Sequence, residues 1–503
     1  MKKVLCLILA GLMLGSALSM VACGNTNETN QDQGQGDTQA VVEEDTTPPE
    51  YICEIPSTLK FDGKEVNILF AKRPGREDEM VSADHLGEGV LSDAVYQRNM
   101  AVEEQLGVKL VYIANDDDTV SDKLKTDISS GDGAYDLIAD GTFRAIVPVI
   151  DGFYKDLNQT EYVDTSKHYW TQGYNDMVTF TSDNKQYLVT GSVAISLFRY
   201  MYLTIYNKTL MEELDKPNLY DVIKNGQWTL DYQYGLINET YADYGDPAVD
   251  EGDFHGFVTG DTISVDPYMV ACDIPMIIKD AETRELVFNI EAQSKLVDLC
   301  DKVQKLYNDQ STYVYKTSAM DDVGKTNIIQ KFTNKKAMMA TIQFYSMETN
   351  YNEVGALDYG IAPIPKFSED QKEYRSYVQD QVTGMGISAV VRSDREDMVS
   401  ATLESIGYHS YRLVRPAYYE TTLSKRYMQD ENSLEILGLI FDSLSFDFSS
   451  TCGNIVTSCV IRDQLRPVLS GKNNTVASKM NSWKRSMDRS LGSHNQKLAE
   501  LES

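Results

Sequence analysis

The sequence KEVNILF, at residues 64–70, combines branched and aromatic apolar residues in the pattern of a β-strand. Residues 92–106 follow as a predicted helix, and Ser92 is a suitable N-cap for it. The apolar side chains of this helix recur at helical spacing, at Val95, Val102 and Leu106. A second strand, VKLVYI, is predicted at residues 108–113. The order strand, helix, strand is typical of a largely parallel sheet covered by helices.

The same alternation continues along the chain. An amphipathic stretch near residues 122–129 is followed by a third predicted strand at residues 135–140. We therefore expect an α/β lobe with a doubly wound sheet. Ligands of such sheets bind at the carboxyl ends of the strands.

Further strands are predicted at residues 201–206, 337–342, 359–362 and 384–391. The last of these has a glycine-rich entry and an apolar character that suit a return to the first lobe, so the chain would cross between two lobes twice and form a hinge. Between residue 207 and about residue 331 we expect mainly helices. A helix is also expected at residues 475–491, with one apolar face formed by Val476, Met480, Trp483 and Met487.

About 450 residues follow the N-terminal segment, which is too many for one hydrophobic core and suits two lobes. The expected division is a first lobe at residues 56–190, a second lobe at 191–380, a return to the first lobe at 381–435, and C-terminal helices, mainly of the second lobe, at 436–503.

The N-terminus has the pattern of a bacterial lipoprotein signal peptide. Lys2 and Lys3 precede an apolar run at residues 4–18, which is short for a membrane span and ends close to Ala22 and Cys23. A small residue before a cysteine resembles a lipobox, although Met20 stands where leucine is usual. We expect residues 1–22 to be removed and Cys23 to carry the lipid. The acidic, apolar-poor residues 23–55 would then be a disordered tether.

The composition excludes some partners. The chain has 46 Lys and Arg against 76 Asp and Glu, a formal net charge of −30. A surface that binds nucleic acid, or a polybasic surface that binds membranes, needs clustered basic residues. We therefore expect no nucleic-acid partner. Cys452 and Cys459 are close enough in sequence to form a disulfide. The alternative is that both remain free thiols.

Several segments together resemble a known family. They are LSDAVYQRNMAVEEQLGV (91–108), YLTIYNKTLMEE (202–213), NGQWTLD (225–231), KKAMMATIQ (335–343), YGIAPIPK (359–366) and PAYYETTLSKRYMQDEN (416–432). In order and spacing they resemble the extracellular solute-binding proteins of bacterial ABC importers, in the sugar-type branch (family 1) that includes maltose-binding protein. The resemblance implies an α/β, two-lobed, periplasmic-binding-protein-like (type II) fold with a hinge between the lobes.

Carbohydrate sites combine flat aromatic rings with polar side chains that pair with hydroxyl groups. The aromatic candidates lie beside predicted turns or strand ends: Tyr169, Trp170, Trp228, Phe344 and Tyr345. The polar candidates lie at predicted strand ends and crossings: Arg73, Asp140, Thr142, Ser192, Gln343, Asp380 and Thr383. Each has a structural alternative. The aromatic residues could pack in the core, Asp140 could cap a helix together with Thr142, and Arg73 could lie in a solvated turn.

A weak calcium-loop pattern includes Asp243, Asp246, Asp250 and Asp253. Pro247 and Ala248 interrupt its order and no glutamate stands at the twelfth position, so we expect no metal or other cofactor. The separate acidic run 116–118 is expected to be a solvated turn. No H-E-x-x-H, Walker or G-x-S-x-G sequence occurs, so catalysis has no visible motif.

The resemblance implies a monomeric, lipid-anchored protein on the extracytoplasmic face of the cell membrane. It would capture a carbohydrate, by expectation an oligosaccharide, by closing its lobes, and pass it to the membrane subunits of an ABC importer. Two alternatives remain open. One is a secreted glycoside hydrolase, which would use two carboxylates. The other is a ligand sensor or adhesin with the same fold.

Overall fold

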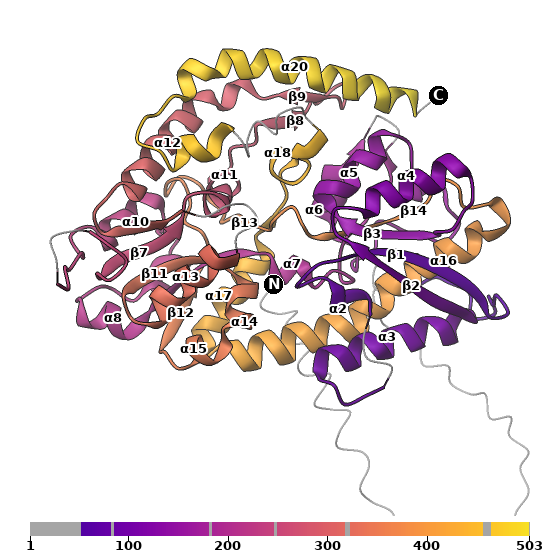
Figure 1. Ribbon diagram of the computed structural model, residues 1–503, viewed down its shortest axis with the longest axis horizontal. Coiled ribbons are helices and arrows are strands. Elements are labelled where there is room, and N and C mark those ends of the chain that lie inside the picture. Colours follow the sequence, from indigo (N-terminus) through magenta and orange to yellow (C-terminus); the bar gives the residue numbers. More distant parts are fainter. Residues whose placement is uncertain are drawn as a thin grey trace, which may run out of the picture. The chain divides into compact units, whose positions relative to one another are not determined.

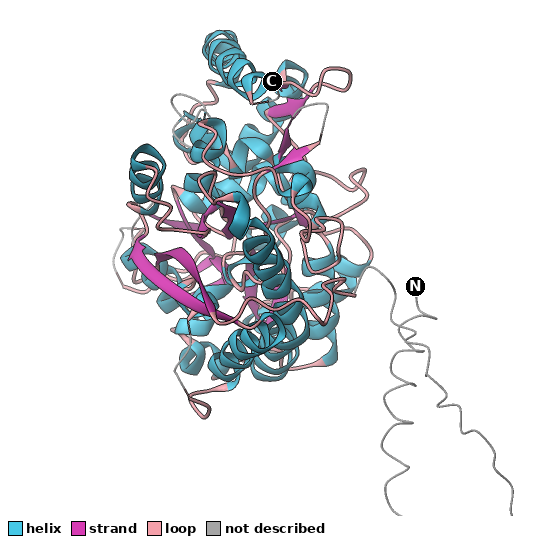
Figure 2. Ribbon diagram, turned by 90° about the vertical axis from the view of Figure 1, so that its right-hand side faces the viewer, coloured by secondary structure: helices cyan, strands magenta, loops and turns pink. Residues whose placement is uncertain are grey.

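The computed structural model describes residues 52–81, 85–180, 184–245, 249–316, 322–455 and 464–501. The chain divides into the units Met1–Thr47 and Pro48–Ser503, and the described residues all belong to the second. The predicted signal peptide and Cys23 lie outside the described residues, as does most of the predicted tether. Helices predominate and surround the strands (Figure 2).

The first lobe is built on a four-stranded sheet with the order β14-β3-β1-β2. Its strands are β1 (Lys64–Lys72), β2 (Val108–Asp116), β3 (Leu137–Gly141) and β14 (Thr383–Ile387). β1 pairs in parallel with β2 and β3, and β14 is antiparallel to β3. The helices that precede β14 in this lobe are α2 (Glu77–Met80), α3 (Val90–Leu106), α4 (Val120–Ser130), α5 (Thr142–Ile150) and α6 (Gln172–Val178). The parallel β1, β2 and β3 follow the predicted alternation.

The start of α3 differs from the prediction. The helix begins at Val90, so Ser92 lies within its first turn and is not the N-cap. The N-cap is Gly89, whose φ of 134° is a backbone conformation that favours glycine. The chain therefore turns into the helix at Gly89, three residues before the predicted N-cap Ser92.

The second lobe is built on a five-stranded mixed sheet with the order β10-β7-β11-β6-β12. Its strands are β6 (Tyr202–Asn207), β7 (His255–Gly260), β10 (Thr312–Tyr315), β11 (Ala337–Gln343) and β12 (Tyr359–Ala362). β7 and β10 were not predicted, because this region was expected to be mainly helical. Every residue of β7 is buried, so no alternation of polar and apolar residues marks it, and β10 has only four residues.

The helices between β6 and β13 are α8 (Lys208–Glu213), α9 (Leu219–Lys224), α10 (Leu230–Ile237), α11 (Asp266–Ala271), α12 (Gln293–Tyr307), α13 (Asp322–Thr333), α14 (Phe344–Thr349) and α15 (Tyr351–Gly355). Beyond the second lobe's sheet come α17 (Glu431–Asp442), α18 (Phe448–Thr451), α19 (Arg466–Leu469) and α20 (Val476–Glu500). The predicted apolar face of α20 is buried, including Trp483. Three two-stranded pairs complete the fold: β4 (Thr179–Phe180) with β5 (Lys185–Gln186), β8 (Ile277–Lys279) with β9 (Leu286–Phe288), and β13 (Ser376–Tyr377) with β15 (Leu444–Ser445).

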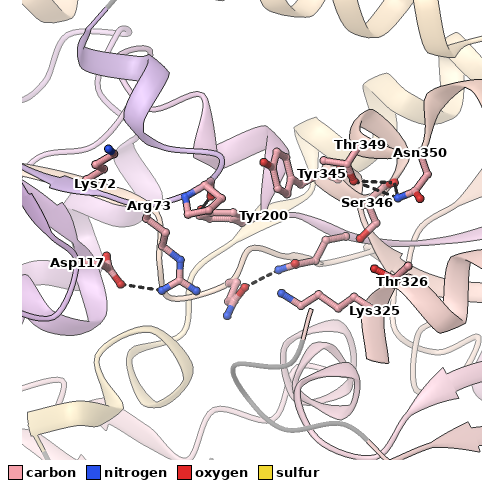
Figure 3. Close-up of a pocket in the computed structure, with 13 residues that line it drawn as sticks. Lys72, Arg73, Asp117, Tyr200, Lys325, Thr326, Tyr345, Ser346, Thr349 and Asn350 are labelled. Carbon is pink, nitrogen blue, oxygen red and sulfur yellow. Dashed lines mark hydrogen bonds and ion pairs between the residues drawn. The ribbon is translucent and has the colours of Figure 1, made fainter. Parts of the chain in front are cut away.

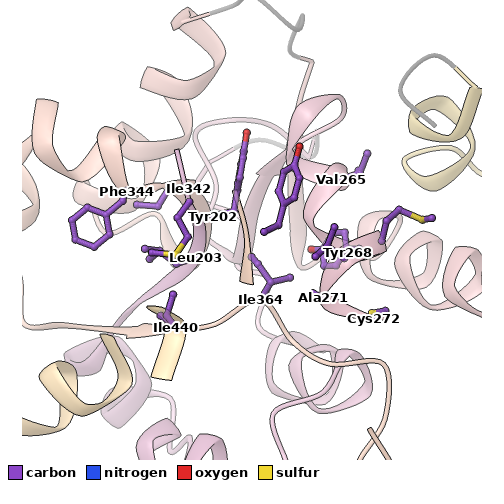
Figure 4. Packing of buried hydrophobic residues seen from close by; sticks show 14 of the residues in the cluster. Tyr202, Leu203, Val265, Tyr268, Ala271, Cys272, Ile342, Phe344, Ile364 and Ile440 are labelled. Carbon is purple, nitrogen blue, oxygen red and sulfur yellow. The ribbon is translucent and has the colours of Figure 1, made fainter. Parts of the chain in front are cut away.

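The core of the second lobe packs side chains of β6 and β11 against the segments that follow the sheet. Leu203 and Ile342 come from neighbouring strands, and Ile364 and Ile440 lie close to them (Figure 4). Phe344 belongs to the same core and is fully buried. This packing holds the end of β11, where the chain enters α14, in a defined position.

Two chain segments cross between the lobes side by side. The first leads through α7 (Ser196–Arg199) into β6, and the second leads from β13 into β14. Met201 and Val378 form an antiparallel bridge, and the Gln379 amide donates to the Tyr200 carbonyl at 3.0 Å. Backbone hydrogen bonds thus join the two crossings to each other.

A long helix also connects the lobes. It runs without interruption from α16 (Ser393–His409) through the π-helical segments η5 (Ser410–Val414) and η6 (Ala417–Tyr427) (Figure 1). α16, η5 and η6 all pack on α3, and Tyr418 at the start of η6 donates to Glu348 of α14 at 3.0 Å. Wide π turns accommodate Pro416, which has no backbone N–H to donate.

Candidate ligand-binding cavity

A cavity of about 470 Å³ lies at the carboxyl ends of β1 and β11 (Figure 3). Its volume falls within the range of roughly 300–1,000 Å³ that is typical of small-molecule sites. The residues that line it are Lys72, Arg73, Pro74 and Asp117 of the first lobe, Tyr200 and Gln379 of the crossings, and Lys325, Thr326, Gln343, Tyr345, Ser346, Thr349 and Asn350 of the second lobe. Both lobes and both crossings therefore contribute to one site.

The first-lobe wall follows from the parallel pairing of β1 and β2. In this register Lys72 lies opposite Asp116, so Arg73 and Asp117 leave the sheet at the same edge. An Arg73 guanidinium nitrogen donates to an Asp117 carboxylate oxygen at 2.9 Å. Arg144 donates to the same oxygen at 2.7 Å, and Arg76 pairs with the other oxygen. Asp117 therefore holds three arginine side chains together.

The second-lobe wall begins where β11 ends. Gln343, the last residue of β11, donates its side-chain amide to Gln379 of the returning crossing. Tyr345 follows in the first turn of α14, and its ring lies edge-to-face with the ring of Tyr200 at 6.4 Å. The Tyr200 hydroxyl donates to the Pro74 carbonyl at 2.6 Å. Tyr200 thus links the two walls.

The Tyr345 ring also makes a cation–π contact. The guanidinium of Arg199 lies 5.7 Å from the centre of the Tyr345 ring. Arg199 itself forms ion pairs with Asp78 at 2.6 Å and with Glu348 at 2.7 Å. The ring therefore has a fixed orientation, which suits stacking against a flat ligand.

Two carboxyl groups are buried near the first-lobe wall. Asp140 is 1% exposed, and burial raises its pKa to about 7, although Arg76 opposes this shift. Burial likewise raises the pKa of Glu79 to about 7, although its carboxylate accepts hydrogen bonds from Ser196 and Thr383. Both groups therefore bind a proton more readily than ordinary carboxyl groups.

The raised pKa of Asp140 predicts a pH-dependent effect of Asp140→Asn. In the wild-type protein the neutral Asp140 carboxyl group contributes to stability in full below about pH 4. This contribution is lost as the pH rises through about 7, because ionisation places a charge in a buried position, whereas an asparagine stays neutral. Relative to wild type, the variant should gain on the order of a few kcal/mol in free energy of unfolding between pH 4 and pH 8.5. Urea unfolding at both pH values measures this difference. Equal differences at the two pH values would contradict the assigned pKa.

The structure brings three of the predicted ligand residues into the cavity: Arg73, Gln343 and Tyr345. Gln343 ends β11, Arg73 directly follows β1, and Tyr345 lies two residues beyond β11. Their contact with a ligand stays a prediction.

The predicted polar residues Asp140, Thr142, Asp380 and Thr383 are all buried and do not line the cavity. Asp140 accepts a hydrogen bond from the Gly141 amide at 2.7 Å, and the Thr142 hydroxyl donates to the Val382 carbonyl at 3.0 Å. Helix α5 has no side-chain cap, so Asp140 does not cap it either. Ser192, 9% exposed, is also outside the lining.

The aromatic candidates other than Tyr345 are core residues. Trp170 is 1% exposed, and its indole N–H donates to Glu404 at 3.2 Å, as does the neighbouring Tyr169 hydroxyl. Trp228 is fully buried, and so is Phe344. Their placement gives no support to a role as ligand platforms.

The sequence interpretation missed several lining residues. Asp117 was expected in a solvated turn, but it is held by three arginines because β1 and β2 end at the same edge. The missed residues Lys72, Tyr200, Lys325, Thr326 and Gln379 also line the cavity. The position of Asp117 directly after a strand was the one available signal.

In the acidic loop near Asp253, carboxylate oxygens accept hydrogen bonds from other groups of the same loop. Asp253 accepts hydrogen bonds from the Tyr244 amide at 3.0 Å, the Asp250 amide at 3.1 Å and the Tyr241 hydroxyl at 2.7 Å. These bonds, led by that from Tyr244, lower the pKa of Asp253 to about 2. Asp243 accepts from the Gly245 amide. Asp246 lies outside the described residues.

Across the described ranges, no group of three or more His, Cys, Asp or Glu side chains is placed to hold a metal ion. Cys452 is buried, and Cys459, its candidate disulfide partner, lies outside these ranges, so the choice between a disulfide and free thiols stays open. Among the helices that the structure describes, none has the length and apolar character needed to cross a membrane.

Two α/β lobes, joined by paired crossings and enclosing a cavity at their strand ends, define the two-lobed periplasmic-binding-protein-like (type II) fold. The predicted fold class is therefore confirmed. Solved structures that share this fold include sugar-binding proteins, one of them from an ABC transporter.

One such structure is the maltose/maltodextrin-binding domain from Bdellovibrio bacteriovorus bound to maltotriose. It is 16% identical, with 84% of this chain and 99% of that chain covered and a TM-score of 0.52. Another is the galacto-N-biose/lacto-N-biose I-binding protein of the ABC transporter from Bifidobacterium longum with lacto-N-biose, at 11% identity, 86% and 98% coverage and a TM-score of 0.54. A cyclo/maltodextrin-binding protein with maltotetraose has 15% identity, 87% and 98% coverage and a TM-score of 0.51.

These similarities confirm, at the level of the fold, the resemblance to sugar-type solute-binding proteins. No protein-family model matches the chain, and no curated protein matches its sequence.

Proposed function

We propose that this protein is an extracytoplasmic, lipid-anchored solute-binding protein that captures a carbohydrate for an ABC importer. The observation that carries the proposal is the cavity between Arg73 and Tyr345, to which both lobes contribute. Similar structures have been solved with maltotriose, lacto-N-biose and maltotetraose bound.

The chemistry of the cavity suits a saccharide. The Tyr345 ring offers a flat surface to the C–H face of a sugar, and the side chains of Gln343 and Asn350 offer donors and acceptors to its hydroxyl groups. Because the walls belong to different lobes, a ligand that touches both favours their closed arrangement. The importer would then recognise the closed form.

In this proposal Cys23 carries the lipid and residues 23–55 tether the binding domain to the membrane surface. The membrane subunits of the importer are the protein partner, and the binding protein acts as a monomer. Closure and release leave the carbohydrate chemically unchanged.

One observation favours binding over hydrolysis. Among the residues that line the cavity in the described part of the chain, Asp117 is the one carboxylate, and three arginines hold it. Glycoside hydrolysis ordinarily uses two carboxyl groups on either side of the scissile bond. The proposal therefore has no catalytic residue.

The test is a titration of purified residues 52–503 with a panel of mono- and oligosaccharides. A saccharide present at 100 times its Kd should raise the free energy of unfolding by about 2.7 kcal/mol, which thermal unfolding detects as a higher Tm. Chromatography of the same mixtures after long incubation should return the saccharide intact. Release of shorter products would instead indicate the hydrolase, and a panel without any binder would refute the proposal.

A further inference from the structure

The charge of the cavity is opposite in sign to that of the chain. Of its lining residues, Lys72, Arg73 and Lys325 are basic and Asp117 is acidic. The whole chain has 76 acidic and 46 basic residues. A positive cavity in so acidic a protein calls for a specific explanation.

The single carboxylate cannot neutralise the cations around it. Asp117 pairs with Arg73 at 2.9 Å, with Arg144 at 2.7 Å and with Arg76. The side chains of Arg73 and Arg144 are each 21% exposed, whereas that of Arg76 is 1% exposed. Three guanidinium charges thus converge on one negative charge, and of the three groups Arg73 is the one that lines the cavity.

The buried carboxyl groups near this cluster reduce the excess positive charge only in part. Arg76 lies 3.8 Å from Asp140, but burial raises the pKa of Asp140 to about 7, so near neutral pH a substantial fraction of it is uncharged. Glu79 is fully buried and its carboxylate is bonded to Ser196 and Thr383. Asp380 of the returning crossing is a further buried carboxyl group, and its charge acts on Arg73. The four cations Lys72, Arg73, Arg76 and Arg144 still outnumber these carboxyl groups in charge, since Asp140 is only partly ionised near neutral pH.

Two further carboxylates near the aromatic wall do not supply the missing negative charge. Glu348 of α14 and Asp78 of α2 both pair with Arg199. The Arg199 guanidinium of this ion-pair group lies over the Tyr345 ring. The excess positive charge is thus concentrated on the side of Lys72 and Arg73, opposite the aromatic wall.

We propose that the ligand is an acidic carbohydrate, with a carboxylate or sulfate group against Arg73 and Lys72 and a neutral sugar face against Tyr345. This inference rests on the proposed function and specifies its substrate class. The planar guanidinium pairs with oxyanions through two parallel hydrogen bonds, which it cannot form with a single hydroxyl. The net charge of the chain opposes the approach of an anion only weakly, because physiological salt screens charges beyond about 8 Å.

Matched pairs of saccharides test the charge of the ligand by isothermal titration calorimetry. The pairs are glucuronate and glucose, galacturonate and galactose, trigalacturonate and its neutral methyl ester, sialyllactose and lactose, and galactose 6-sulfate and galactose. In at least one pair the acidic member should bind roughly tenfold to a hundredfold more tightly than the neutral member, the range expected for a charge-assisted hydrogen bond. Sulfate and carboxylate members identify which anion the site prefers.

Variants locate the contact. For the best acidic ligand, Arg73→Gln should weaken binding at least tenfold, Arg73→Lys should weaken it less, and Lys484→Gln should leave it unchanged. Lys484 is an exposed residue of α20 that pairs with Asp488, so its substitution controls for the loss of one positive charge. Thermal unfolding of each variant confirms that it is folded.

The outcomes separate the two proposals. Neutral members that bind as tightly as their acidic partners, or an Arg73→Gln variant with unchanged affinity, would overturn the acidic ligand and leave carbohydrate capture standing. A complete absence of binding in both series would overturn both.

Discussion

Trp228→Ala should lower the free energy of unfolding by about 3–5 kcal/mol, the cost of removing a large buried aromatic side chain. Trp228 is fully buried, and its indole N–H donates to the Pro363 carbonyl at 2.8 Å. The ring also lies edge-to-face with Tyr232. Urea unfolding followed by circular dichroism measures the loss.

Trp228→Phe is the matched control, because it keeps an aromatic ring and removes the hydrogen bond to Pro363. It should cost less than the alanine variant and should leave saccharide affinity unchanged. A Trp228→Phe protein with normal stability but a weakened affinity would show that Trp228 contacts the ligand after all.

Tyr345→Ala should weaken saccharide binding by about 2 kcal/mol, or roughly thirtyfold, because it removes the aromatic surface of the second-lobe wall. Stability should change little, since Tyr345 is only partly buried. Calorimetric titration of the saccharide that binds wild type best gives the ratio of Kd values.

Tyr345→Phe separates the ring from the hydroxyl and should retain most of the affinity. If Tyr345→Ala bound as tightly as wild type, the ligand would not stack on this ring, and the assignment of the cavity would fail.

The fold was predictable where the sequence pattern repeats a simple period. The alternation of apolar strands with amphipathic helices between residues 64 and 140 predicts β1, β2 and β3 in their parallel arrangement. β7 and β10 were not predictable in this way. β7 has six residues and β10 has four, and so short a run has no period that distinguishes it from part of a helix.

The site was predictable only in part. Strand ends pointed to Arg73, Gln343 and Tyr345, because the chain must leave the sheet where a ligand can approach. Trp170 and Trp228 also lie beside turns, but tertiary packing buries them. The ring of Trp170 packs on Gly407, where an added Cβ would lie only 2.6 Å from it, and Gly407 is more than two hundred residues away in the sequence. Such contacts leave no local pattern.

Asp117 illustrates the same limit for charges. In the sequence it is the middle of three aspartates, a pattern typical of solvated turns. In the structure it pairs with Arg73, Arg76 and Arg144, which come from two separate segments. The pairing of β1 with both β2 and β3 brings these residues together, and register is a property of the folded sheet.

A crystal structure of the protein with its best saccharide ligand tests the central claim most directly. We expect the ligand in the cavity of about 470 Å³, hydrogen-bonded to Arg73 of one lobe and stacked on Tyr345 of the other. A ligand bound at any other place, or one that contacts a single lobe, would contradict capture between the lobes.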